Sequence, residues 1–427
     1  MTGAREAEPA ADAEMARGAG SAADSAAVTG AGSAAGRAQG APAAAVKRLV
    51  VVPDGMADEP LPELGGRTPL AVADTPAMDA LARSGTVGLV WTVPDGMAPG
   101  SDVANLAVLG YDPAAVYSGR SPLEAASIGV ELGPGDVAYR CNLVTVVDGV
   151  MYDHTAGHIT DEDARRCVAA LRAALGGGPF EFHAGVSYRT LMVWRGGRLV
   201  PCTPPHDILG RPVADFLPLS DELRDLMARG AAALAGVRPG TSIWLWGEGT
   251  APSMPRFADL YGLRGAVVGA VDLVRGIGRY AGFDVLEVPG ATGDLDTDYG
   301  AKARAALEAL DDHDLVWVHV EAPDEAAHMG SLCEKIRAIE RVDREVLAPL
   351  LAAVPAAAVL VLPDHQTPVR IRTHAGGPVP FVFARADGAL LSSSSPAPAF
   401  SELEAERTGV FVDDGSTLMR MFLAATG

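Results

Sequence analysis

The stretch VKRLVVVPDGM, residues 46–56, decides the predicted fold. Its short, continuous run of β-branched residues is typical of a strand that is buried on both faces of a parallel sheet. An acidic residue, Asp54, follows the strand directly. Two later stretches repeat the pattern, since DLVWVHV (314–320) leads into Glu-Ala-Pro-Asp and the apolar run 357–362 leads into Pro-Asp-His. Because ligands bind beyond the carboxyl ends of strands in open α/β sheets, the three stretches indicate one functional edge.

Helical patterns separate these strands, for example over 301–310 and 332–354. The alternation of strands and helices predicts a doubly wound, mostly parallel sheet. The region 125–250 differs, because strand-like pieces alternate there with glycine turns. We therefore predict a core domain, formed by 47–124 and 251–427, that is interrupted by a smaller inserted α+β domain covering the substrate.

The first 46 residues are rich in Ala and Gly and carry no apolar stripe that could be buried against a core. We therefore predict that residues 1–46 form a disordered tail. They show no pattern of a signal peptide, because they have no long apolar segment.

The charge balance limits the classes of partner. Lys and Arg total 34 and Asp and Glu total 54, so the formal net charge is −20. Nucleic acid and anionic membranes require clustered positive charge, so neither is expected as the main partner. A small anionic substrate stays compatible, because bound metal ions invert the local field. No apolar run reaches the length of about 18 residues that a membrane helix needs.

The cysteines indicate a compartment. The chain has four of them and no CxxC pair. This usage disfavours a disulfide framework or a zinc knuckle, and it predicts a reducing, cytoplasmic location. The sequence leaves a homo-oligomer open.

Five side chains of metal-ligand type follow the last two predicted strands: Asp324, His328, Asp364, His365 and His374. Asp324 and His328 are one helical turn apart, so both can face one ion. A mixed carboxylate and imidazole set without thiolates suits Mn²⁺, Zn²⁺, Co²⁺ or Mg²⁺. A single histidine is more often a hydrogen-bonded core residue, but five such residues at strand ends predict a metal site.

The segment Pro99-Gly100-Ser101-Asp102 supplies a candidate nucleophile. Glycine before the serine allows a tight turn, and a helix that begins there presents backbone N–H groups to an anion. A divalent ion would convert the weakly nucleophilic hydroxyl into an alkoxide. A Ser-His-Asp hydrolase is the weaker interpretation, since no G-x-S-x-G motif is present. Taken alone, the segment favours a helix cap over a nucleophile.

A set of motifs resembles the archaeal type of 2,3-bisphosphoglycerate-independent phosphoglycerate mutases, which belong to the alkaline phosphatase superfamily. The resemblance extends over nearly everything from residue 47 to the C-terminus. It implies an alkaline-phosphatase-like core. The motifs are DGM (54–56), GGRTPL (65–70), PGSDVANLAVLGYDP (99–113), GRSPLEAA (119–126), DVAYRCN (136–142), ATGDLDT (291–297), VEAPDEAAH (320–328) and LPDHQTP (362–368).

The resemblance implies two divalent metal ions. One would be held by Asp324, His328 and His374. The other would be held by Asp54, Ser101, Asp364 and His365. Mn²⁺ is the expected ion, with Mg²⁺, Co²⁺ and Zn²⁺ as alternatives. Ser101 would take the phosphoryl group from 3-phosphoglycerate as a phosphoserine, and the 2-hydroxyl of the retained glycerate would take it back.

The resemblance also implies ligands for this small phosphorylated substrate. Arg140, Asn142, Arg189 and His206 on the predicted insert would hold it, together with Lys302 on the core side. Arginine suits the task because it binds carboxylate or phosphate with two parallel hydrogen bonds. For each residue the alternative is a solvated surface group. The role of His158 stays open, because family members often have Arg or Glu there.

Three other activities share the expected chemistry. They are a homoserine-kinase-like transfer, a mutase that acts on a phosphonate analogue, and a phosphatase in which water accepts the phosphoryl group. The kinase is disfavoured by the absence of a G-x-x-x-x-G-K-[ST] motif.

Overall fold

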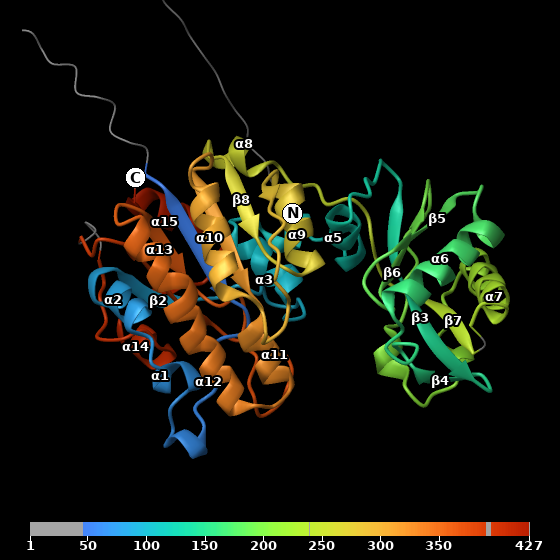
Figure 1. Ribbon diagram of the computed structural model, residues 1–427, viewed down its shortest axis with the longest axis horizontal. Coiled ribbons are helices and arrows are strands. Elements are labelled where there is room, and N and C mark those ends of the chain that lie inside the picture. Colours follow the sequence, from blue (N-terminus) through green and yellow to red (C-terminus); the bar gives the residue numbers. More distant parts are fainter. Residues whose placement is uncertain (1–45, 239, 390–393, 427) are drawn as a thin grey trace, which may run out of the picture. The chain divides into compact units, whose positions relative to one another are not determined.

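A computed structural model describes residues 46–238, 240–389 and 394–426, which form one compact unit. The predicted tail lies outside the described residues except for Val46. Eight strands form the large sheet (Figure 1). In spatial order they are β13 (Phe411–Val412), β2 (Thr86–Val90), β12 (Val379–Arg385), β11 (Ala358–Val361), β1 (Arg48–Pro53), β10 (Leu315–Val320), β8 (Gly265–Val268) and β9 (Asp284–Val285).

The centre of this sheet is parallel. β1 lies between β10 and β11 and is parallel to both, and β8 and β9 continue the parallel arrangement. Only β12 is antiparallel to its neighbours, β11 and β2. The structure therefore confirms a doubly wound, mostly parallel sheet.

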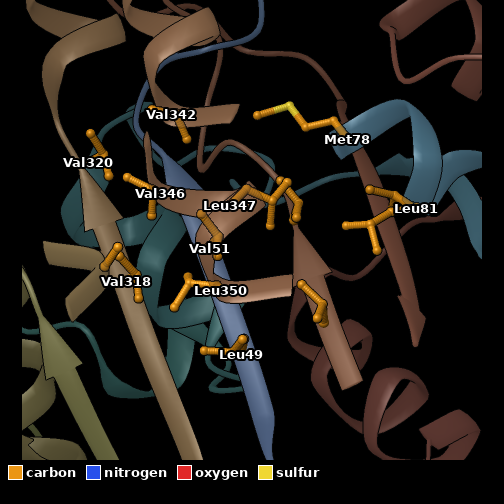
Figure 2. Packing of buried hydrophobic residues seen from close by; sticks show 14 of the residues in the cluster. Leu49, Val51, Met78, Leu81, Val318, Val320, Val342, Val346, Leu347 and Leu350 are labelled. Atoms are coloured by element: carbon orange, nitrogen blue, oxygen red, sulfur yellow. The ribbon is translucent and has the colours of Figure 1, made fainter. Parts of the chain in front are cut away.

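Side chains of the central strands alternate between two apolar layers. Leu49 and Val51 of β1 contribute to one layer, whereas Val50 and Val52 contribute to the other. This explains the continuous apolar run in the sequence, because a strand covered on both faces has no polar face. Figure 2 shows the first layer, where Leu49, Val51 and Val318 meet helical side chains such as Val346 and Leu350.

Helices cover both faces of the sheet. The first apolar layer is closed by α2 (Pro76–Ser84), α10 (Tyr299–Ala309), α12 (Leu332–Arg341), a π-helical turn (Val342–Leu347), α13 (Ala348–Ala353) and α14 (Glu402–Arg407). The second layer is closed by α3 (Ser101–Val108), α5 (Arg120–Ser127), α8 (Phe257–Tyr261), α9 (Asp272–Ala281) and α15 (Leu418–Thr426). Three short helices connect these elements: α1 (Pro69–Val72), α4 (Pro113–Val116) and α11 (Ala322–His328).

A second, antiparallel sheet uses the middle of the chain and has its own apolar core. Two helices pack side by side against it, α6 (Asp161–Leu175) and α7 (Asp221–Ala235), as Figure 1 shows. Its strands are β3 (Val137–Val147), β4 (Val150–Asp153), β5 (Phe180–Ala184), β6 (Thr190–Trp194) and β7 (Thr241–Gly249).

This α+β part falls within the predicted range 125–250. We propose that it is the inserted domain of the chain. Each of its helices begins with a hydroxyl cap, since Thr160 accepts a hydrogen bond from the Asp163 N–H and Ser220 accepts one from the Leu223 N–H. Among the described residues, no helix is both long enough and apolar enough to cross a membrane.

Candidate active site

The candidate site lies where three adjacent strands of the large sheet end. Pro53, the last residue of β1, pairs with Val320 of β10, and Val51 pairs with Val361 of β11. The chain leaves the sheet at this edge in three places. It continues into Asp54, into α11 with Asp324 and His328, and into the segment that carries Asp364 and His365.

One group of side chains consists of Asp324, His328 and His374, and we call it group A. The Nε2 atom of His328 lies 3.1 Å from Asp324 Oδ2 and 3.1 Å from His374 Nε2. His374 Nε2 lies 3.8 Å from the same carboxylate oxygen. The structure therefore brings together the three residues that the sequence assigns to one ion.

A second group, called group B, consists of Asp54, Ser101, Asp364 and His365. Ser101 is the first residue of α3, and its Oγ lies 3.1 Å from His365 Nε2. The same nitrogen lies 3.5 Å from Asp54 Oδ1 and 3.5 Å from Asp364 Oδ2. The side chains assigned to the other ion thus converge on the candidate nucleophile.

The two groups adjoin each other. The rings of His365 in group B and His374 in group A have centroids 4.2 Å apart. Possible ligand atoms of Asp324, His365 and His374 lie within 4.8 Å of one another, so they could hold a metal ion.

Three carboxylates of the site are buried. Asp54 is 5% exposed, Asp324 is 8% exposed and Asp364 is fully buried. Burial and the neighbouring charges of Asp364 and Asp324 raise the pKa of Asp54 well above its usual value. Asp54 Oδ1 has no hydrogen-bond partner among the described residues. An unpartnered buried carboxylate oxygen beside two other carboxylates fits a divalent cation, which would supply the missing positive charge.

The ionisation of His328 leads to a prediction about pH. The hydrogen bond to Asp324 raises the pKa of His328 to about 9, although burial opposes the shift. A metal ion binds the neutral imidazole, so below that pKa it has to displace a proton. Calorimetric titration with Mn²⁺ should therefore show affinity rising about tenfold per pH unit from about pH 7 to pH 9. The slope should be smaller in His328→Asn, and an affinity that does not change with pH would contradict this assignment.

Two further buried residues of the site escaped the sequence analysis. His319 of β10 is fully buried, and its Nε2 lies 3.7 Å from Asp54 Oδ2. Possible ligand atoms of Asp54, His319 and Asp364 lie within 4.8 Å of one another. Asn105 of α3 donates from Nδ2 to Asp364 Oδ2 at 2.8 Å and to the Ser101 carbonyl at 3.0 Å. The available signals were an imidazole within an apolar strand and an amide one helical turn after the serine.

Lys302, a predicted substrate ligand, lies inside the core. Its side chain is fully buried, and its ammonium donates to Glu321 Oε2 at 2.5 Å and to the His319 carbonyl at 3.0 Å. The ammonium therefore has protein partners and no exposed surface to offer a substrate. Glu321 also accepts hydrogen bonds from the Ala270 and Val271 N–H groups. Lys302 therefore helps to hold the end of β10, which carries His319.

Three of the predicted substrate ligands gather around Trp246 of β7. The Arg140 guanidinium lies 4.5 Å from the centre of the Trp246 ring, and Asn142 Oδ1 accepts a hydrogen bond from Trp246 Nε1 at 3.1 Å. The His206 ring lies 5.2 Å from the Trp246 ring. Glu124 of α5 binds Arg140 with both carboxylate oxygens, each at 2.8 Å, which fixes the guanidinium plane.

Arg189 and His158 make no ring contact with Trp246 among the contacts of the described residues, although Arg189 interacts electrostatically with both Arg140 and Glu124. Arg189 stacks its guanidinium on Tyr188, 5.6 Å from the ring centre. Burial lowers the pKa of Arg189, but Tyr188 and the charges of Glu124 and Glu325 outweigh this and raise it above its usual value. His158 is exposed and adopts a left-handed backbone conformation with φ 51°.

Comparison with known proteins gives consistent matches. Residues 82–236 match the family model described as "2,3-bisphosphoglycerate-independent phosphoglycerate mutase". A relative of that name from Methanothrix thermoacetophila is 49% identical over 397 residues, which cover 89% of this chain and all of the relative.

Solved structures agree with the sequence relatives. The PH0037 protein from Pyrococcus horikoshii superimposes with a TM-score of 0.77 at 28% identity, covering 90% of this chain and 97% of that one. The cofactor-independent phosphoglycerate mutase from Thermoplasma acidophilum superimposes with a TM-score of 0.64 at 26% identity, covering 90% and 100%.

Proposed function

The chain belongs to the 2,3-bisphosphoglycerate-independent phosphoglycerate mutase family, whose members are isomerases, and from this we propose its reaction. We propose that it interconverts 3-phosphoglycerate and 2-phosphoglycerate through a phosphoserine at Ser101. One observation carries this proposal. The Ser101 hydroxyl is the first side chain of α3 and lies 3.1 Å from Nε2 of His365, whose ring adjoins that of His374 in group A.

We propose that group A and group B each hold one divalent ion, with Mn²⁺ as the expected metal. Bound ions would lower the pKa of the Ser101 hydroxyl and neutralise charge on the phosphoryl oxygens. The protein supplies the frame for this chemistry. Asn105 holds both the Ser101 carbonyl and the Asp364 carboxylate, so the nucleophile and its neighbouring carboxylate keep a fixed relation.

The reaction consists of two transfers that balance each other. In the first, Ser101 Oγ forms a bond to phosphorus, loses its proton, and the bond from phosphorus to the 3-oxygen of glycerate breaks as that oxygen gains a proton. In the second, the 2-oxygen of glycerate loses its proton and forms a bond to phosphorus, while the bond from phosphorus to Ser101 Oγ breaks and that oxygen regains a proton. The N-terminus of α3 favours the phosphoryl charge in both states, because its first N–H groups have no partners within the helix.

Between the two transfers the glycerate has to turn without leaving. We propose that the cluster around Trp246 holds its carboxylate and hydroxyl groups, with Arg140 as the main anion ligand. Water has to be excluded while the glycerate turns, because water would otherwise hydrolyse the phosphoserine and the protein would act as a phosphatase.

Arg140→Lys tests this assignment. Lysine keeps the positive charge but loses the planar guanidinium that Glu124 orients. It therefore cannot bind the substrate anion with two parallel hydrogen bonds, as arginine can. We expect kcat/KM for 3-phosphoglycerate to fall by about 100-fold, equivalent to roughly 2.7 kcal/mol. Steady-state kinetics measure the effect, and Arg198→Lys, a change at an exposed arginine that pairs with Glu222, serves as the matched control. Equal kinetics in Arg140→Lys and wild type would remove Arg140 from the substrate site.

An isotope experiment tests retention of the glycerate. 3-Phosphoglycerate with carbon-13 in its carbons and oxygen-18 in its phosphoryl group is mixed with an equal amount of unlabelled substrate. Mass spectrometry of the first 2-phosphoglycerate formed should show both labels or neither. Molecules with a single label would show that glycerate leaves and another molecule accepts the phosphoryl group.

The cysteines support a cytoplasmic location, which we propose for this enzyme. All four are free thiols, and Cys141 and Cys167 are buried. Such a chain needs no oxidising compartment to fold.

A further inference from the structure

The three histidines of groups A and B share one arrangement. Each places Nδ1 against a fixed oxygen and turns Nε2 toward the site. His328 Nδ1 lies 3.0 Å from the Arg372 carbonyl, and His374 Nδ1 lies 3.2 Å from the Pro99 carbonyl. A carbonyl only accepts, so both rings carry a hydrogen on Nδ1, and Nε2 is the nitrogen that each ring offers to a metal ion once the ring is neutral.

The third histidine has a side chain in place of the carbonyl. His365 Nδ1 lies 3.1 Å from the hydroxyl oxygen of Thr367. A hydroxyl can donate or accept, so this contact does not by itself fix the ring. The other partner of Thr367 decides the direction.

That partner is a carboxylate. Thr367 Oγ1 donates to Asp324 Oδ1 at 2.6 Å. Because a hydroxyl has one hydrogen and an ionised carboxylate only accepts, the Thr367 hydrogen is committed to Asp324. The hydroxyl oxygen therefore accepts the hydrogen of His365 Nδ1, which leaves the His365 Nε2 lone pair facing Ser101 Oγ.

The backbone of Thr367 is held on both sides. Its N–H donates to the Ala57 carbonyl at 3.1 Å, and its carbonyl accepts from Lys335 Nζ at 2.8 Å. Lys335 is fully buried and pairs with Asp58 at 2.8 Å, so this support does not depend on solvent.

Gly55 leaves room for the arrangement. A Cβ atom there would lie 2.3 Å from Asp324 Oδ1 and 2.6 Å from Thr367 Oγ1, in a backbone conformation with φ 58° that disfavours other residues. The chain thus keeps this space free for the contact between Thr367 and Asp324.

We propose that Thr367 is a positioning residue that links the two metal-binding groups. Its hydroxyl joins Asp324 of group A to His365 of group B and sets the orientation of both. His328 and His374 are oriented by backbone carbonyls, which a substitution does not remove. The orientation of His365 depends on the Thr367 side chain, so a substitution at Thr367 can change it. The inference rests on the proposed function only in taking groups A and B as metal sites.

Thr367→Val tests the proposal, because valine keeps the shape of the side chain and removes the hydroxyl. Calorimetric titration of the metal-free full chain with Mn²⁺ measures the affinity of both sites. We expect both to bind about 10- to 100-fold more weakly than in wild type, the usual cost of removing a partner of a metal ligand. Thr367→Ser retains the hydroxyl and should restore affinity to within a few-fold of wild type. Thr426→Val removes another buried hydroxyl, one that bonds the Phe422 carbonyl in α15, and should leave Mn²⁺ binding unchanged.

The outcomes separate this inference from the proposed function. Wild-type chain that binds no Mn²⁺ would overturn the proposed metal sites. If wild type binds Mn²⁺ at two sites and Thr367→Val binds it with the same affinities as wild type, only the role of Thr367 is overturned. Nitrogen-15 NMR of the wild-type imidazoles needs no variant to fold. It should show His365 with hydrogen on Nδ1, and hydrogen on Nε2 would overturn the proposal.

Discussion

Ser101→Ala is expected to lower kcat for phosphoryl transfer by about 10³-fold or more, the scale seen when a covalent nucleophile is removed. The substitution deletes the oxygen that would carry the phosphoryl group and leaves every carboxylate and imidazole of groups A and B in place. Mn²⁺ should therefore still bind, so loss of activity and loss of metal can be measured separately. Steady-state kinetics and calorimetry on the same preparation give the two results.

Ser84→Ala provides the matched control. Its hydroxyl lies at the end of α2 and donates a hydrogen bond to the Ala80 carbonyl. Ser84→Ala therefore deletes the same hydroxyl group as Ser101→Ala, but in a region that holds no site residue. Activity there should equal that of wild type. Full activity in Ser101→Ala would remove the phosphoserine from the mechanism.

Removal of metal is expected to have a comparable effect. Exhaustive chelation should lower kcat by about 10³-fold or more, because charge stabilisation worth several kcal/mol is lost at the transferring phosphoryl group. It also leaves the buried carboxylates Asp54, Asp324 and Asp364 without compensating cations. Addition of Mn²⁺ or Co²⁺ should restore the rate, as measured by assay before and after dialysis.

The control for chelation is a measurement that the chain stays folded. Circular dichroism should show the same secondary structure before and after treatment, since the two apolar layers of the large sheet do not involve the site. Activity that survives while metal analysis finds none would contradict a metal-dependent mechanism.

The central part of the fold could be predicted from local sequence. The apolar runs at 46–53, 314–320 and 357–362 became β1, β10 and β11, which lie side by side. A strand buried on both faces leaves such a signal because its side chains on either face pack into an apolar layer. The antiparallel direction of β12 leaves no such signal, because it depends on the path of the chain around the sheet edge and not on composition.

Asp324, His328, Asp364, His365 and His374 were predicted because carboxylates and imidazoles gather at strand ends, whereas Asp54, Ser101 and the division into groups A and B came from the family resemblance. His319 was missed because its place in the run LVWVHV is that of a core residue, and only the sheet register brings it within 3.7 Å of Asp54. Thr367 was missed for a similar reason. A threonine hydroxyl carries no charge, and its meaning depends on Asp324, 43 residues earlier in the chain.

Lys302 shows how a partner within the protein can be hidden in the sequence. A lysine near a phosphate-handling motif suggests a substrate contact, yet a buried lysine needs a buried acid, and Glu321 supplies it at 2.5 Å. Sequence separation gave no indication of that pair, because α10 and the end of β10 meet only in the folded chain.

Phosphorus NMR of the metal-loaded enzyme with 3-phosphoglycerate, in the absence of nucleotide and bisphosphate, tests the central claim most directly. The proposed mechanism predicts that the signal of 2-phosphoglycerate appears without inorganic phosphate, because glycerate stays bound and takes back the phosphoryl group. Release of inorganic phosphate in place of 2-phosphoglycerate would show that water is the acceptor. An unchanged spectrum would contradict the assigned substrate.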